Sequence, residues 1–309
     1  MPDGPVLIVG CGYAGKAVAR RLSACGVPVT GTVTGSEGAD AVIACGATPE
    51  VLDLRHALEG SGHRLAALIE KHPYIVYAAG PNRVGDSERF VDFSGVFAER
   101  VRRAGNPSAF VYLSSTGVYG YRGGDWVDED TPPGDDLGPR GMVRVAAEAA
   151  LLAACKEWGL PLRILRPAGI YGPGRHVGAR IAGGHYRVIE ADPPIVVNRI
   201  HVDDLARAVT AALVRGTDGG IYLVADGHPT TLREVADYAA ALMGLDPPPG
   251  EPAEAARARM GEANFHLVSD SKRCRNRRLL DELRVKLAYP DYKNGLKQAM
   301  QVDGLIRKT

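Results

Sequence analysis

The chain has 309 residues, of which 45% are hydrophobic and 24% are charged. This balance is typical of a folded globular protein, and it excludes a disordered chain, a collagen and a coiled coil. The 37 basic and 36 acidic residues leave a net charge of +1, so no global field predicts a nucleic-acid or membrane partner.

Short apolar runs alternate with longer segments of helical periodicity from residue 5 onward. The predicted strands are Val6–Val9, Val29–Val33, Val51–Leu52, Ile75–Ala78, Phe110–Leu113, Leu162–Leu165 and Ile221–Val224. Apolar residues at three- and four-residue spacing predict helices over Ala14–Ala24, Leu65–Lys71, Gly85–Ala104, Met142–Trp158, Val202–Val214 and Leu232–Met243. This alternation predicts an α/β fold with a doubly wound parallel sheet.

A glycine motif follows the first predicted strand and opens the first predicted helix. Gly10, Gly12 and Gly15 stand at G-x-G-x-x-G spacing, with Tyr13 and Ala14 inside the motif. The first glycine permits a tight turn, the second lets a pyrophosphate approach the backbone, and the third lets the helix pack on the strand. The motif predicts a dinucleotide site, and the alternative is a glycine turn that serves packing only.

The residues after the second strand bear on the choice of dinucleotide. An acidic residue there would bind the ribose 2′-hydroxyl of NAD, but the chain has Thr34, Gly35 and Ser36. Without a carboxylate to repel a 2′-phosphate, we expect NADPH to be preferred over NADH. Asp53, after the third strand, is a candidate for binding the adenine amino group or a solvated turn residue.

The strand and helix rhythm loosens after residue 170 and again after Pro247–Pro249. We interpret residues 1–170, completed by 198–226, as the dinucleotide-binding domain. Residues 171–197 and 227–309 are interpreted as a smaller lobe that closes the crevice and selects the substrate.

The five cysteines are scattered and have no metal-ligand spacing. They are Cys11, Cys25, Cys45, Cys155 and Cys274, and we expect them to be reduced, with no bound metal. The N-terminus has no basic stretch before its apolar run, and no apolar run reaches 18 residues, so we expect a cytoplasmic protein without a membrane partner.

Three further segments carry a family resemblance: LSSTGVYG at 113–120, RPAGIYGPG at 166–174 and NRIHVDDL at 198–205. Together with the glycine loop they resemble the extended short-chain dehydrogenase/reductase family, which includes NAD-dependent sugar epimerases and dehydratases. The resemblance extends over essentially the whole chain, including the tail from Tyr289 to Leu296. It implies a Rossmann fold with a small C-terminal substrate lobe, and a possible homodimer.

The chain departs from that family at its usual proton relay. Members pair a Ser or Thr with a Tyr and a Lys at Y-x-x-x-K spacing, but these two positions here fall on Arg140 and Arg144. No tyrosine stands between Tyr121 and Tyr171, and Lys156 is the only lysine in that interval. Arginine stays protonated, so it can hold a carbonyl oxygen or a ribose hydroxyl but is a poor proton donor.

Reduction of a ketone is the reaction that demands least of such a site. We assign Ser115 to polarise the carbonyl, with Arg144 or Arg140 contacting ribose or substrate; a solvated basic stripe is the alternative for the arginines. The chain resembles atypical reductases that act on angucyclinone-type aromatic polyketides, whose acidic hydroxyl could supply the proton. The alternatives are a catalytically silent NADP(H)-binding sensor or scaffold and, further, a sugar-nucleotide epimerase.

Other candidates follow from their places at the ends of strands or in the lobe. The resemblance and the small size of several of these residues predict cofactor contacts at Ala79, Gly80, Ser114, Pro167, Ala168 and Gly169. Substrate contacts are predicted at Pro81, Thr116, Tyr119, Tyr171 and His176.

Overall fold

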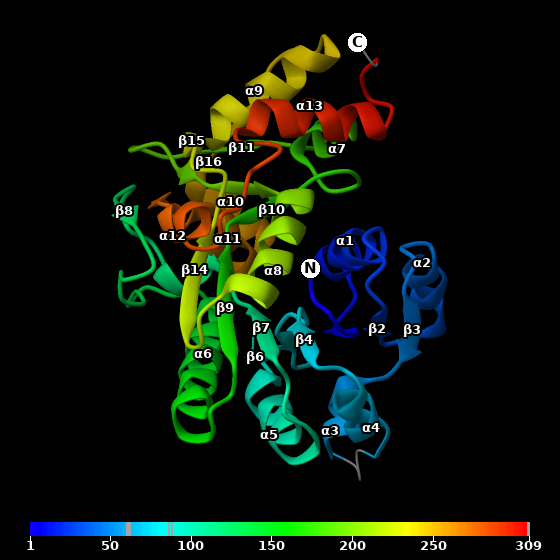
Figure 1. Ribbon diagram of the computed structural model, residues 1–309. Helices are drawn as coiled ribbons and strands as arrows, with labels where there is room; N and C mark the ends of the chain where they lie inside the picture. Colours follow the sequence, from blue (N-terminus) through cyan, green and yellow to red (C-terminus); the bar gives the residue numbers. More distant parts are fainter. Residues whose placement is uncertain (60–62, 86, 88, 308–309) are drawn as a thin grey trace.

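The computed structural model describes residues 1–59, 63–85, 87 and 89–307, and its centre is a seven-stranded parallel sheet (Figure 1). The strands lie in the order β14-β9-β7-β4-β1-β2-β3. Their bounds are β1 Val6–Val9, β2 Val29–Val33, β3 Thr48–Val51, β4 Tyr74–Tyr77, β7 Ala109–Leu113, β9 Leu162–Pro167 and β14 Gly220–Val224. The order reverses between β1 and β4, and ligands of open parallel sheets bind at such a point.

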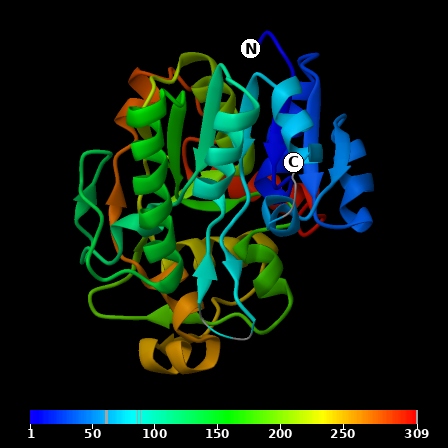
Figure 2. The ribbon, with the colours of Figure 1, turned by 90° about the horizontal axis from the view of Figure 1, so that it is seen from below.

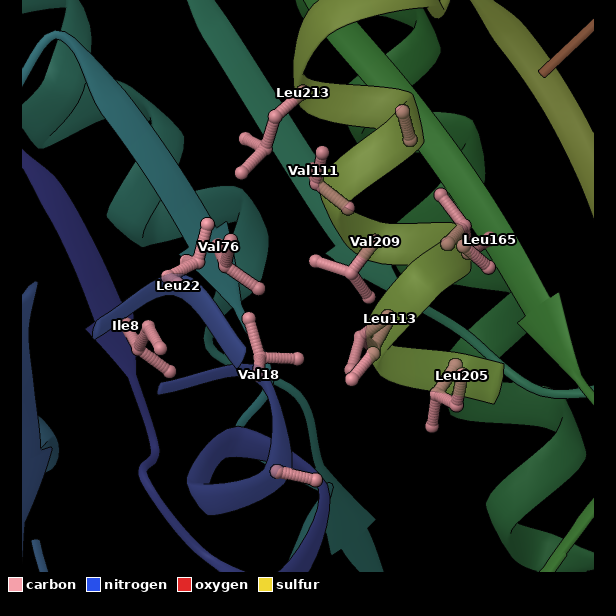
Figure 3. Close-up of a cluster of buried hydrophobic side chains, with 14 of the residues drawn as sticks. Ile8, Val18, Leu22, Val76, Val111, Leu113, Leu165, Leu205, Val209 and Leu213 are labelled. Atoms are coloured by element: carbon pink, nitrogen blue, oxygen red, sulfur yellow. The ribbon is translucent and has the colours of Figure 1, made fainter. Parts of the chain in front are cut away.

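Helices cover both faces of this sheet. The helices α1 (Tyr13–Ser23), α2 (Ala39–Ile43) and α8 (Val202–Arg215) contribute to one buried cluster, part of which Figure 3 shows around Val18, Val111 and Val209. The opposite cluster is built with α3 (Leu54–Glu59), α4 (His63–Lys71), α5 (Ser94–Ala104) and α6 (Pro139–Trp158). The predicted doubly wound Rossmann architecture is confirmed.

Two predicted elements are wrong in part. The third strand is not Val51–Leu52 but Thr48–Val51, and its polar sequence escaped the search for apolar runs because β3 is an edge strand. The helix predicted from Gly85 begins only at Ser94. Gly85 has a φ of +56°, and β5 (Asn82–Arg83) pairs antiparallel with β6 (Phe90–Val91) instead; residues 86 and 88 of that prediction lie outside the described residues.

A third buried cluster belongs to the C-terminal lobe, which lies beyond the carboxyl ends of the strands (Figure 1). Figure 2 shows the hairpin of β5 and β6 projecting on the side of this lobe. The lobe's helices include α7 (Val177–Ala182), α9 (Leu232–Met243), α10 (Ala253–Met260), α11 (Glu262–Ser269) and α13 (Tyr292–Val302).

Short paired strands lie outside the main sheet. The pairs are β10 (Gly169–Tyr171) with β13 (Arg199–His201), β11 (Val188–Glu190) with β16 (Gly250–Pro252), β12 (Val196–Val197) with β15 (Thr230–Thr231), and β8 (Trp126–Val127) with β17 (Arg273–Cys274). One pair, β8 with β17, joins the sheet domain to the lobe. After β17, α12 (Arg277–Asp281) returns to the sheet, because Leu279 and Leu283 pack in the same cluster as α1 and α8.

Candidate active site

The glycine loop joins β1 to α1 and is held tightly against β4. Gly10 has a φ of +86°, and a Cβ built on it would lie 2.6 Å from Cα of Ala79. A Cβ on Gly15 would lie 2.8 Å from the carbonyl oxygen of Gly10, so α1 packs directly on the turn. These two positions therefore require glycine for backbone reasons alone.

Gly12 differs from both because it faces open space. A Cβ built on Gly12 would have no atom within 4 Å, and Gly12 precedes α1 without any side-chain cap on the helix's first N–H groups. Tyr13 and Ala14 begin that helix, where unpaired N–H groups and the helix dipole favour a negative charge. A dinucleotide pyrophosphate fits this cradle, and its backbone approach to Gly12 is unobstructed.

The segment after β2 is open to solvent. Thr34, Gly35 and Ser36 are all exposed, and Ser36 begins a short 3-10 helix, η1 (Ser36–Gly38), whose next residue is Glu37. Asp53 lies two residues beyond β3, where its Oδ1 accepts a hydrogen bond of 2.9 Å from the Arg55 N–H. Its carboxylate thus supports the start of α3 in this structure.

Ser115 lies at the carboxyl end of β7, at the edge of the sheet where the glycine loop also lies. Its Oγ accepts a hydrogen bond of 3.0 Å from the Gly117 N–H and caps the 3-10 helix η2 (Thr116–Tyr119). The side chain is half-buried, and none of the described residues accepts its hydroxyl hydrogen. The Ser115 hydroxyl hydrogen is therefore available to a ligand, while its oxygen is held by the Gly117 N–H.

The neighbouring Ser114 instead turns into the interior. Its hydroxyl donates to Oε1 of Glu148 at 2.5 Å, and Arg166 binds the same carboxylate through Nη2 at 2.7 Å. Arg166 also donates to the hydroxyl of Tyr119 at 2.9 Å. We call Ser114, Glu148, Arg166 and Tyr119 the paired cluster; all four are buried, so Tyr119 lies in the interior and its hydroxyl does not line the crevice.

Arg144 is buried on α6 and is fully engaged by an acidic partner. Its Nη1 lies 3.0 Å from Oδ2 of Asp92 and 2.7 Å from the hydroxyl of Tyr112. Arg140, one turn earlier, is half-buried, and its guanidinium carbon lies 4.8 Å from the centre of the Phe90 ring. The two arginines therefore do not form the solvated basic stripe that was the alternative for them.

The remaining cofactor candidates lie where β4 and β9 end. Ala79 touches Gly10 as described, and Gly80 is exposed beside it, with Pro81 half-buried. On β9 and β10, Pro167 and Ala168 are buried and Gly169 is exposed, and Thr116 is half-buried at the start of η2. These segments meet the glycine loop and Ser115 at the carboxyl edge of the sheet.

Tyr171 and His176 lie in the lobe. Tyr171 is buried, and His176 Nε2 lies 2.8 Å from Oδ2 of Asp303 at the end of α13. The same carboxylate oxygen accepts the Gly174 N–H at 2.7 Å. The turn between these residues also touches the glycine loop, because the Tyr13 hydroxyl donates to the carbonyl of Pro173 at 3.1 Å; burial raises the pKa of Tyr13 to about 12.

Among the described ranges, no three His, Cys, Asp or Glu side chains gather in a way that could hold a metal ion. No helix in that part of the chain is long and apolar enough to cross a membrane.

Sequence reasoning missed the acidic partners of the site. Asp92 pairs with Arg144, and Glu148 accepts the Ser114 hydroxyl. Neither acidic residue belongs to a sequence motif that predicts such a contact. For Glu148 a signal exists: it lies one turn after Arg144 on the buried face of α6, and a buried carboxylate requires a cation. Asp92 lies in the segment that was predicted as helix, so its direction could not be anticipated.

The sheet order, the glycine loop and the crevice at the carboxyl edge define a Rossmann-type dinucleotide-binding protein. Residues 6–225 match the model of the NAD dependent epimerase/dehydratase family, and the chain belongs to this family.

Relatives of known sequence or structure cover nearly the whole chain. It is 30% identical to Protein YeeZ of Escherichia coli K12, over 93% of this chain and 96% of that protein. It is similar to a functionally unknown conserved protein from Silicibacter pomeroyi, with 32% identity, a TM-score of 0.82, and coverage of 97% and 99% of the two chains. UDP-glucose 4-epimerase of Thermotoga maritima shares the fold, with 21% identity, a TM-score of 0.78, and coverage of 96% and 97%.

Proposed function

We propose that the protein is an NADPH-dependent ketoreductase that transfers a hydride to the ketone of a small molecule. The observation that carries this proposal is the Ser115 hydroxyl, which is fixed at the carboxyl edge of the sheet with its hydrogen free to bind a carbonyl oxygen. The bound NADPH would supply the hydride. A donor held in place in this way stabilises negative charge as it develops on the oxygen.

Arginines on α6 assist in different ways. The Asp92 carboxylate holds Arg144 in a buried position and neutralises its charge, so Arg144 positions neighbouring groups rather than acting as a mobile arm. Arg140 has no such carboxylate partner among the described residues and lies over Phe90, from which it can reach a ribose or substrate hydroxyl. Neither guanidinium gives up a proton readily.

The proton for the new alcohol comes from outside the buried tyrosines. Burial raises the pKa of Tyr112 and Tyr119 above that of an ordinary tyrosine, and both hydroxyls are already hydrogen-bonded within the protein. Solvent or an acidic hydroxyl of the substrate therefore remains as the source. This requirement favours hydroxylated aromatic polyketides of the angucyclinone type, in which a phenol neighbours the ketone.

Epimerisation and a sensor role are less well supported. Epimerisation needs a base that first takes and later returns a proton, and no such group accompanies Ser115. A silent sensor would keep the cofactor site without any need for a hydroxyl donor available to a substrate. Ser115 has such a donor, which favours an enzyme.

Isotope transfer tests the reaction directly. The full chain is mixed with NADPH deuterated at the transferable position and with polyketide ketones, simple ketones and nucleotide sugars, and the products are weighed by mass spectrometry. One deuterium at a carbinol carbon is expected for a polyketide ketone. NADPH binding without deuterium in any product would favour the sensor.

A matched pair of serine variants then tests the assigned donor. Ser115→Ala should lower kcat by about 100-fold, the size expected for loss of one oxyanion donor. Ser108→Ala is the control, because Ser108 is exposed just before β7, at the end remote from the crevice. Equal turnover of Ser115→Ala and wild type would remove the role given to Ser115.

The preference for NADPH has its own test. The exposed hydroxyls of Thr34 and Ser36 can donate to a 2′-phosphate, and Glu37, the next residue, is the nearest carboxylate in the sequence that could oppose one. We expect a lower Kd for NADPH than for NADH by fluorescence titration, and Glu37→Gln should widen this difference. A lower Kd for NADH in both proteins would reverse the assignment.

A further inference from the structure

The C-terminal lobe contains a small pocket. About 190 Å³ of space lies between its walls and open solvent, and the inner part has room for about one water-sized group, so the pocket can take the tip of a molecule rather than a whole substrate. Its walls come from β10, β13, α7, α9 and α13 and are formed by Tyr171, His176, Val177, Arg199, Val235, Tyr292 and Leu296.

Two side chains of this pocket have buried donors without acceptors. The hydroxyl of Tyr171 and Nε of Arg199 are inaccessible to solvent and have no hydrogen-bond partner. Burial of a guanidinium N–H or a phenol hydroxyl without an acceptor destabilises a fold, and most buried polar groups in proteins therefore have a hydrogen-bond partner. The third polar wall residue, His176, differs because both its ring nitrogens are engaged, by the Ala179 N–H and by Asp303.

Arg199 also lacks a counter-ion. No carboxylate oxygen among the described residues lies within 4.0 Å of its nitrogens. The acid that acts on it electrostatically is Asp226, whose Oδ1 accepts the His228 N–H at 2.9 Å and whose Oδ2 has no partner. Burial raises the pKa of Asp226 to about 7, which weakens it as a permanent counter-ion.

We propose that this pocket binds a carboxylate group, with Arg199 and the Tyr171 hydroxyl as its donors. A guanidinium and one hydroxyl match the charge and acceptor geometry of a single carboxylate. A phosphate dianion would place a second negative charge beside Asp226 with only one cation in contact, so it fits the pocket less well. The proposal gives Tyr171, which the sequence analysis expects to contact the substrate, a carboxylate as its ligand, and it does not require hydride transfer.

Acetate is the probe for the test, because it presents the group without other contacts. The full chain without cofactor is titrated with acetate at constant ionic strength, and the Kd is measured by NMR line broadening of ¹³C-labelled acetate. Arg199→Gln should weaken binding by about 10-fold or more, and Tyr171→Phe should weaken it by about 3-fold, as expected for loss of hydrogen bonds to a charged group. Asp226→Asn should tighten binding because it removes the nearby acid.

Arg180→Gln is the matched control. Arg180 lies on α7 in the same lobe and acts electrostatically on Arg199, but it is exposed and does not line the pocket. Its removal should change the acetate Kd by less than about 2-fold, in accordance with the small effects of solvated charges. Equal weakening in Arg180→Gln and Arg199→Gln would overturn the proposal by showing a general charge effect.

Other outcomes also decide the matter. Unchanged acetate affinity in Arg199→Gln, or inorganic phosphate binding more tightly than acetate, would overturn the assignment. If Arg199→Gln does not fold, Tyr171→Phe carries the test, and wild-type affinity in that variant contradicts the proposal. Because no hydride transfer is measured, failure of the reductase assignment would leave this result standing.

Discussion

Arg166 and Arg199 are both removed from bulk solvent on their guanidinium side, but their surroundings differ completely. Arg166 makes three contacts with Glu148 at 2.7 to 3.2 Å and a fourth with Tyr119. The Nε of Arg199 has no hydrogen-bond partner among the described residues. The pKa of Arg166 is raised by its hydrogen bonds to Glu148, whereas burial lowers that of Arg199.

The comparison separates a structural arginine from one available to a ligand. In the paired cluster every charge is neutralised inside the protein, so the group fixes β9, α6 and η2 against one another below Ser115. In the lobe the charge is left uncompensated, and a ligand could satisfy it. Pairing thus distinguishes the two roles where residue type and burial do not.

The largest effect is expected when the paired cluster is broken. Arg166→Gln leaves Glu148 as a buried carboxylate without its cation, so the free energy of unfolding should fall by about 3–5 kcal/mol. Urea unfolding measures this change. Arg102→Gln on α5 is the control: Arg102 pairs with Glu99, their side chains are 47% and 38% exposed, and its loss should cost about 1 kcal/mol or less. Equal losses would mean that pairing inside the cluster contributes nothing special.

A pH-dependent effect is expected beside Arg199. Asp226 has a folded-state pKa of about 7 against 3.8 when unperturbed, so the folded state binds more protons between these values. The free energy of unfolding should therefore fall as pH rises from about 4 to about 7, with a slope of up to about 1.4 kcal/mol per pH unit. The difference between wild type and Asp226→Asn isolates this slope from other titrating groups. Parallel curves for the two proteins would contradict the prediction.

A smaller effect is expected for the edge of the paired cluster. Ser114→Ala removes the 2.5 Å hydrogen bond to Glu148 but leaves the Arg166 contacts in place. The free energy of unfolding should fall by about 1–2 kcal/mol, as for a hydrogen bond to a charged group. Thermal unfolding at pH 7 would show it, and an unchanged midpoint would indicate that water replaces the hydroxyl.

The smallest effect is expected for Arg199 in the absence of ligand. Arg199→Gln removes a desolvated charge whose Nε has no hydrogen-bond partner, so the free energy of unfolding should change by less than about 1 kcal/mol. Urea unfolding in a buffer without carboxylates is the measurement. A loss as large as that of Arg166→Gln would mean that Arg199 is a structural residue, and the contrast between the two arginines would disappear.

The sheet could be predicted because the local sequence preferences of its strands agree with their burial in the folded protein. β1 is a continuous apolar run and β2 is rich in β-branched residues, and α9 has both helical periodicity and a Thr231 cap, so their predicted bounds match those observed. The edge strand β3 and the β5–β6 hairpin escaped, because the first is polar and the second depends on a turn at a left-handed Gly85.

The candidate site was predictable only where backbone geometry dictates residue type. Gly10 and Gly15 could be predicted from the motif, because a Cβ at either position would collide with neighbouring backbone atoms. The contacts of polar side chains could not be predicted in this way: Ser114 and Ser115 are neighbours in one hydroxyl run, but Ser114 donates to buried Glu148, whereas Ser115 accepts from the Gly117 N–H. The pocket at Arg199 is recognised because Arg199 Nε has no hydrogen-bond acceptor, and no sequence pattern predicts the absence of a contact.

Asp303 connects distant ends of the chain. It holds Gly174 and His176 from the end of α13, and the turn that contains them meets Tyr13 through the carbonyl of Pro173. The first and last helices are thus mechanically linked through a few hydrogen bonds. A C-terminal affinity tag or a truncation that displaces Asp303 would therefore disturb the dinucleotide loop. Purification tags belong at the N-terminus. If a protein with a C-terminal fusion loses cofactor affinity, the fusion is the first cause to test.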